Sequence, residues 1–164
     1  MLNLWHNAAG TAEVSKMEAK KSYKTFRYQN DLTWKSGLRG AVVSPGKHDV
    51  IVGSPPEFKG EEGLWSPEDL LVGALNTCLM LTFLAYAKHK GLEVVAYESH
   101  ADGLLENVEG KYRVTQITVD PRVSLKSQSD FGRAGEIMAS AKEGCFISNS
   151  ITATVKLSPQ FRVA

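Results

Sequence analysis

The most marked hydrophobic pattern lies near the middle of the chain, where residues 70–87 contain no charged side chain. Ser66, Pro67 and the two acidic residues after them are typical of a helix start, and Gly91 is typical of a left-handed helix exit. This pattern predicts one helix of about 24 residues between these signals. An all-round apolar helix is a buried helix, and a chain of 164 residues can hardly cover it alone. We therefore expect the helix to lie in a core shared by two copies of the chain, as a homodimer.

The same segment has to be weighed as a membrane span, because about eighteen uncharged residues meet the minimum length for one. Asn76, Thr77, Thr82 and Gly73 dilute its hydrophobicity, and it is the only such segment in the chain. The amphipathic remainder is typical of a soluble protein. We expect no membrane association.

Alternation of apolar and polar residues predicts strands on both sides of this helix. The predicted strands cover residues 23–28, 32–34, 41–43, 49–52, 92–97, 112–119 and 151–157. One apolar stripe at helical spacing predicts a second helix over residues 130–142. Because turns join the early strands, this order favours an α+β fold with mostly antiparallel sheets over a βαβ array.

The pattern also divides the chain. Residues 1–21 mix small, polar and charged residues without a period, so we expect an N-terminal arm followed by a single domain over 22–164. Residues 53–63 contain two prolines and three glycines and are predicted to form a long loop ahead of the helix. Loops of this kind often border a site.

Composition and charge exclude some classes of function. The chain is 43% hydrophobic and 23% charged, which is ordinary for a globular domain. A formal net charge of +1 gives no basic field that would collect nucleic acid or anionic lipid. The first sixteen residues have neither a basic n-region nor an apolar h-region, so we expect a cytoplasmic protein.

The candidate chemistry lies in two cysteines, Cys78 and Cys145. They are too few for a disulfide scaffold and too far apart for a CxxC box, so they are either two buried hydrophobic residues or a working pair. A thiol in apolar surroundings has a raised pKa and is inert unless a cation or a hydrogen-bond donor stabilises the thiolate. The four histidines show no ligand spacing, and we expect no metal site.

Two motifs resemble the OsmC/Ohr family of thiol-dependent peroxidases. The first is SPEDL at residues 66–70, with Cys78 ten residues after Glu68, and the second is AKEGCFISN at residues 141–149. The predicted order of strands and helices also agrees with this family over residues 22–160. The resemblance implies an OsmC-like fold around a long buried central helix. It also implies an intertwined homodimer with two active sites at the subunit interface, and no bound cofactor.

The resemblance further implies a reaction. Cys78 would be the peroxidatic cysteine and Cys145 the resolving one. The substrate would be a small organic hydroperoxide, which is reduced to an alcohol during oxidative stress. An external dithiol, for example of the lipoyl type, would then reduce the resulting disulfide.

Two further site residues come from the resemblance, Glu68 and Arg39. In the family, the glutamate pairs with an arginine that faces the reactive cysteine. Glu57 occupies the position where one subgroup has its arginine, so Arg39 is the nearest substitute and Arg27 a weaker one. Without the resemblance, Glu68 would be a first-turn residue favoured by the helix dipole, and Arg39 a solvated charge in a turn.

Helix geometry limits what Glu68 can do. Ten residues of straight helix separate it from Cys78 by about 80° around the axis and about 15 Å along it, so the two side chains cannot touch. Either Gly73 interrupts the helix, or Glu68 acts through an intermediary or from the other subunit.

Two other function classes stay open. The first alternative to the peroxidase is a non-catalytic dimer of this fold that binds an apolar ligand or a partner, and the second is a general thiol–disulfide exchange protein. The large apolar residues around Cys78 are either core or the wall of a pocket for the organic part of a hydroperoxide. A cation in contact with the Cys78 sulfur would favour the peroxidase, and its absence would favour the binding protein.

Overall fold

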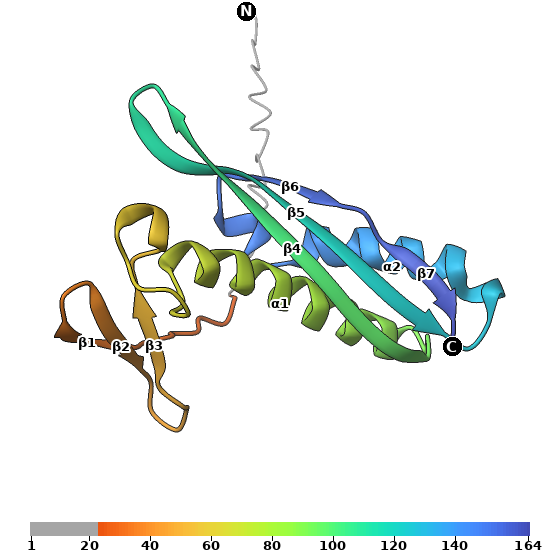
Figure 1. The fold of residues 1–164 in the computed structure, drawn as a ribbon. Helices are drawn as coiled ribbons and strands as arrows, with labels where there is room; N and C mark the ends of the chain where they lie inside the picture. The colour runs from red at the N-terminus through yellow and green to blue at the C-terminus, as the bar shows by residue number, and fades with distance from the viewer. Residues whose placement is uncertain (1–22) are drawn as a thin grey trace, which may run out of the picture.

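The computed structural model describes residues 23–164, so the expected N-terminal arm lies outside the described residues. These residues form two sheets and two long helices (Figure 1). The strands are β1 (Asp31–Ser36), β2 (Arg39–Val43), β3 (Val50–Gly53), β4 (Val94–Val108), β5 (Lys111–Leu125), β6 (Thr154–Leu157) and β7 (Gln160–Val163). The helices are α1 (Pro67–His89) and α2 (Phe131–Gly144), with short 3-10 turns at Pro56–Phe58, Gln128–Asp130 and Ser148–Ser150.

The two sheets differ in their pairing. The first is antiparallel throughout, in the order β1-β2-β3, and lies beyond the N-terminal end of α1 (Figure 1). In the second, β4 and β5 form a long antiparallel hairpin, while β6 and β7 both pair with β5 in parallel. The predicted α+β class and the mostly antiparallel arrangement are confirmed, and the parallel pairs follow from the return of the chain through α2.

The β4–β5 hairpin is much longer than the sequence pattern indicated. Its tip is a two-residue turn at Glu109 and Gly110, whose φ angles of 53° and 82° match the right-handed twist of the flanking strands. Pro121 ended the apparent alternation in β5. It lies where the pairing of β5 changes from β6 to β7, so the missing N–H falls at an interruption of the ladder.

One predicted strand was wrong and one observed strand was missed. Residues 23–28 have no regular secondary structure, and Tyr23 and Tyr28 are 79% and 90% exposed. Their alternating pattern lacks a neighbouring strand among the described residues, and a strand needs a hydrogen-bonded partner. At the other end of the chain, β7 was not predicted, because Pro159 and only four residues gave too short a signal.

Helix α1 begins and ends where the sequence indicated. The hydroxyl of Ser66 accepts a hydrogen bond from the Asp69 N–H at 3.0 Å, and the Asp69 carboxylate accepts one from the Ser66 N–H at 3.0 Å. This reciprocal capping box fixes the first turn. Gly91 has a φ of 65°, the left-handed exit that was predicted. The helix runs unbroken through Gly73, which removes the first of the two alternatives for Glu68, an interruption of the helix there.

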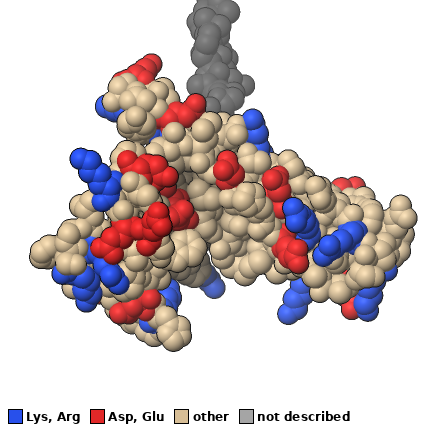
Figure 2. Space-filling model, in the orientation of Figure 1, with Lys and Arg blue, Asp and Glu red and all other residues tan. Residues whose placement is uncertain are grey.

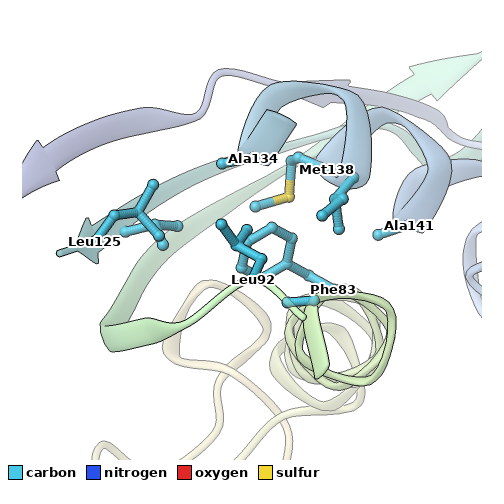
Figure 3. Close-up of a cluster of buried hydrophobic side chains, with 9 residues drawn as sticks. Phe83, Leu92, Leu125, Ala134, Met138 and Ala141 are labelled. Atoms are coloured by element: carbon cyan, nitrogen blue, oxygen red, sulfur yellow. The ribbon is translucent and has the colours of Figure 1, made fainter. Parts of the chain in front are cut away.

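Both helices cover one face of the second sheet. In β5, alternate residues from Ile117 to Leu125 are buried toward them. Figure 3 shows the larger core cluster, in which Ala134 and Met138 of α2 face Phe83 of α1. A second cluster surrounds Leu75 and Leu79 nearer the start of α1 and includes Cys145.

Within one chain, α1 is buried along a single stripe rather than on all faces. The buried residues are Leu75, Leu79, Phe83 and Ala87, which follow one another at four-residue spacing. Leu81, on another face, is 57% exposed. The helix is long and apolar enough to cross a membrane by length and composition, a property that core helices share. The shared core of a homodimer stays a prediction.

Glycines allow two close contacts with α1. At Gly103 of β4, a Cβ would overlap the side chain of Val72. At Gly144, the last residue of α2, it would overlap the hydroxyl of Tyr86. Both residues allow the backbone of a neighbouring element to lie directly against α1.

This packing predicts opposite effects for two alanine substitutions in α2. Gly144→Ala should lower the free energy of unfolding by about 1 to 3 kcal/mol, because the new methyl group forces Tyr86 to move. Gly135→Ala should raise it by up to about 1 kcal/mol, because alanine favours the helix and its Cβ would meet only Phe161 at 3.9 Å. Denaturant unfolding of the two variants measures the difference. Equal stability of the two would contradict the contact.

Candidate functional site

The packing of α1 against α2 brings the two cysteines together. Cys78 lies in the middle of α1, and Cys145 directly follows the last residue of α2. Both are free thiols, Cys78 packs against the core cluster that contains Cys145, and each thiol shifts the pKa of the other. Cys145 is fully buried, whereas Cys78 is partly exposed. Of the predicted site residues, this is the pair that the fold places in contact.

The surroundings of Cys78 favour its thiolate. Burial raises the pKa of the Cys78 thiol, but four hydrogen bonds lower it. The combined effect of the hydrogen bonds is larger than the effect of burial. The donors are the backbone N–H groups of Ile147 and Phe146, the Cys145 thiol and the Thr82 hydroxyl. The pKa of Cys78 therefore lies below its ordinary value of 9.0.

The surroundings of Cys145 have the opposite effect. Burial, the hydrogen bond to Cys78 and the charge of the Cys78 thiolate raise the pKa of Cys145 to about 11. The N–H of Ser148 donates a hydrogen bond to the Cys145 sulfur at 3.4 Å, which opposes this rise only in part. Neutral Cys145 thus serves as a hydrogen-bond donor to ionised Cys78.

Cys78 lines a cavity of about 820 Å³ between α1 and the turn after α2. No charged side chain lines this cavity in the part of the chain that the structure describes, so the cation that would favour a peroxidase over a binding protein is not supplied within one described chain. The lining residues are Trp65, Leu70, Gly73, Ala74, Thr77, Cys78, Leu81, Thr82, Ala85, Tyr86, Gly144, Phe146 and Ile147. The wall is thus mainly apolar, with the sulfur and a few hydroxyl groups as its polar part.

Glu68 and Arg39 lie together elsewhere. They line a different cavity of about 700 Å³ at the first sheet, which has no lining residue in common with the Cys78 cavity. Arg39 approaches Glu61 at 3.8 Å in an exposed ion pair of little energetic weight. One carboxylate oxygen of Glu68 is buried without a hydrogen-bond partner. Within one chain, therefore, neither residue meets the cysteine pair, as expected for a straight helix.

The polar residues inside α1 have separate explanations. Asn76 accepts a hydrogen bond from the Ser99 hydroxyl of β4 at 2.7 Å, so it ties the helix to the sheet. Thr82 bonds to the backbone of its own helix, because its hydroxyl donates to the Cys78 carbonyl at 2.8 Å. Thr77 lines the Cys78 cavity.

Sequence reasoning missed Thr82 and the backbone donors of the site. Thr82 follows Cys78 by four residues, and this one-turn spacing was the available signal. Tyr86, one of the large residues left open as core or pocket wall, lies one turn further along the same wall. The N–H groups of residues 146 and 147 gave no signal, because every residue except proline has one.

Among residues 23–164, no cluster of three or more His, Cys, Asp or Glu side chains is placed to hold a metal ion. On the face seen in Figure 2, acidic and basic side chains are interspersed, with uncharged surface between the charged groups. This agrees with the formal net charge of +1.

The chain is similar in sequence and in fold to known proteins. A curated relative, the uncharacterized protein YmaD of Bacillus subtilis, is 29% identical over 119 residues, which are 71% of this chain and 79% of that protein. Among solved structures, an OsmC-like protein of unknown function from Vibrio cholerae has a TM-score of 0.77 and 25% identity. The match covers 83% of this chain and 100% of that one.

A second solved structure is an organic hydroperoxide resistance protein from Legionella pneumophila. It has a TM-score of 0.63 and 20% identity, over 85% of this chain and 100% of that one, and it supports the fold. The family model described as OsmC-like protein matches residues 60–160, which include both cysteines and Glu68. The chain therefore belongs to the OsmC-like family, which also contains organic hydroperoxide resistance proteins.

Proposed function

We propose that this protein is a cytoplasmic, thiol-dependent peroxidase that reduces organic hydroperoxides to alcohols. The observation that supports this most directly is the thiol pair itself, in which a pKa lowered at Cys78 accompanies one raised to about 11 at Cys145. A nucleophile and a protonated neighbour are the two groups that such a reaction needs. Membership in a family with organic hydroperoxide resistance proteins agrees with it.

In the first step, the Cys78 thiolate attacks the terminal oxygen of the hydroperoxide. An S–O bond forms, the O–O bond breaks, and the alkoxide takes up a proton to leave as an alcohol. Cys78 becomes a sulfenic acid. The apolar wall formed by residues such as Trp65, Leu81 and Phe146 would hold the organic part of the substrate and favour alkyl or aryl peroxides.

In the second step, Cys145 attacks the sulfenic sulfur. The S–S bond forms, and the hydroxyl group leaves as water with the thiol proton. Oxidation of Cys78 removes its negative charge, one of the causes that hold the pKa of Cys145 high, so Cys145 ionises more readily once it is needed. An external dithiol, for example of the lipoyl type, would then reduce the disulfide by exchange and become a disulfide itself.

We further propose that the working site needs two chains. Glu68 and Arg39 line one cavity and Cys78 another, and a straight α1 keeps them apart within a chain. The exposed apolar side of α1 would be covered in a homodimer, which would bring Arg39 and Glu68 of one subunit to the Cys78 cavity of its partner. The unpartnered Glu68 oxygen would then accept a hydrogen bond from Arg39.

The proposal predicts which cysteine is indispensable. With cumene hydroperoxide and a dithiol, Cys78→Ser should abolish peroxide consumption. Cys145→Ser should retain a first turnover and leave Cys78 as a sulfenic acid, which dimedone labels. Peroxide loss and the mass of the labelled peptide are measured. Equal slow rates in the unchanged protein and in Cys78→Ser, with reduction of disulfide substrates intact, would favour a thiol–disulfide exchange protein instead.

The two pKa values predict separate pH profiles. A thiol reacts as its thiolate, so alkylation of Cys78 by iodoacetamide should reach half its maximal rate below pH 9.0. The rate at Cys145 should still be rising near pH 11. Mass spectrometry of the two peptides after short pulses reports each rate. Coincident profiles would refute the division of roles between the two thiols.

Mixing of variants tests the two-chain site. Cys78→Ser and Arg39→Ala chains should each be nearly inactive alone. If Arg39 acts on the partner's Cys78, mixed dimers contain one complete site, and random pairing at equal amounts restores roughly a quarter of the activity. If Arg39 acts within its own chain, no mixture regains activity. Refolding the two chains together, followed by the peroxidase assay, distinguishes these results.

A further inference from the structure

The Thr82 hydroxyl lies one helical turn after Cys78 and borders the same cavity. It donates a hydrogen bond to the Cys78 carbonyl at 2.8 Å. It also lies close enough to the Cys78 sulfur to lower the pKa of that thiol. Two acceptors of one residue therefore lie within reach of one hydroxyl group.

A hydroxyl group has one proton and can donate to only one of these acceptors at a time. The Cys78 carbonyl lies inside α1, where the regular helix N–H also serves it, so it does not depend on Thr82. A thiolate, in contrast, is an acceptor only, and a hydrogen bond to a charged acceptor is stronger than one to a neutral carbonyl. The preferred acceptor therefore changes when Cys78 ionises.

We propose that Thr82 stabilises the Cys78 thiolate by turning its hydroxyl proton from the Cys78 carbonyl to the Cys78 sulfur. The importance of this donor for peroxide reduction rests on the proposed function, but the hydrogen bond itself does not. Rotation of the hydroxyl about the C–O bond redirects the proton within one helical turn, so the helix stays intact. The rotation adds a donor to an otherwise mainly apolar wall.

The hydrogen bond from Thr82 to the Cys78 thiolate matters because the described chain supplies no charged side chain to the Cys78 cavity. The thiolate depends on neutral donors there, namely two backbone N–H groups, the Cys145 thiol and Thr82. The backbone N–H groups and the Cys145 thiol are fixed by the turn after α2. Thr82 is the donor that belongs to the same helix as Cys78, so it keeps its position even if that turn moves during disulfide formation.

The test compares three substitutions by the pH profile of Cys78 alkylation, with the full chain in its native assembly. Thr82→Val keeps the shape but removes the donor, and it should move the midpoint of the profile upward by about one pH unit. Thr82→Ser keeps the hydroxyl and should leave the midpoint within a few tenths of a unit. Thr77→Val is the matched control for this titration, because Thr77 lines the same cavity but does not contribute to the pKa shift of Cys78, and it should leave the midpoint of the alkylation profile in place.

An unchanged midpoint in Thr82→Val, or an equal shift in Thr77→Val, would overturn the proposal. Circular dichroism and thermal unfolding show whether the variants are folded, and Thr82→Ala replaces Thr82→Val with the same expectation if valine disturbs the helix. Alkylation needs no peroxide, so the result holds even if peroxidase activity is absent. If activity is present, Thr82→Val should lower kcat/KM up to about tenfold at pH values below the midpoint and recover above it.

Discussion

The contact between α1 and the turn that ends α2 is the constraint on which the site depends. Gly144 allows the chain to lie directly against Tyr86, and the next residues then direct Cys145 and two backbone N–H groups toward Cys78. Without this contact, burial would still raise the pKa of Cys78, but most of the hydrogen-bond donors that lower it would be lost. The stability of the α1–α2 core and the chemistry of the thiol are therefore linked.

Neutral hydrogen-bond donors lower the pKa of a thiol in a different way from a cation. An arginine beside a sulfur lowers the pKa through a charge that acts over several ångströms, whereas N–H and O–H donors act only at contact and in the right direction. The Cys78 thiolate is thus sensitive to small displacements of the turn at residues 144–147. The two thiols are also mutually dependent, because protonated Cys145 supports the Cys78 thiolate and the charge of that thiolate keeps Cys145 protonated. This dependence favours Cys78 as the thiol that reacts first and Cys145 as the thiol that reacts second.

The sequence predicted the elements with strong local signals. The capping box at Ser66, the exit at Gly91 and the stripe of α2 were readable because each depends on neighbouring residues. The strand at 23–28 failed because pairing is a long-range property, and β4 and β5 were shortened where alternation stopped. Cys78 and Cys145 were identified through their motifs, but the N–H donors have no sequence signature, and Thr82 was recognised only once its hydroxyl was placed.

The position of Glu68 and Arg39 follows from the same straight helix that positions Cys78. Because α1 is unbroken, the end that carries Glu68 faces the first sheet while its middle faces the turn after α2. A chain with an interrupted helix could bring Glu68 and Arg39 to its own Cys78, whereas the straight α1 of this chain cannot. A buried carboxylate oxygen without a partner and an apolar helix covered along only one stripe are both costly in an isolated chain. A second chain would remove both costs at one interface. The straight helix that separates Glu68 and Arg39 from Cys78 within one chain therefore favours a site in which they come from different chains.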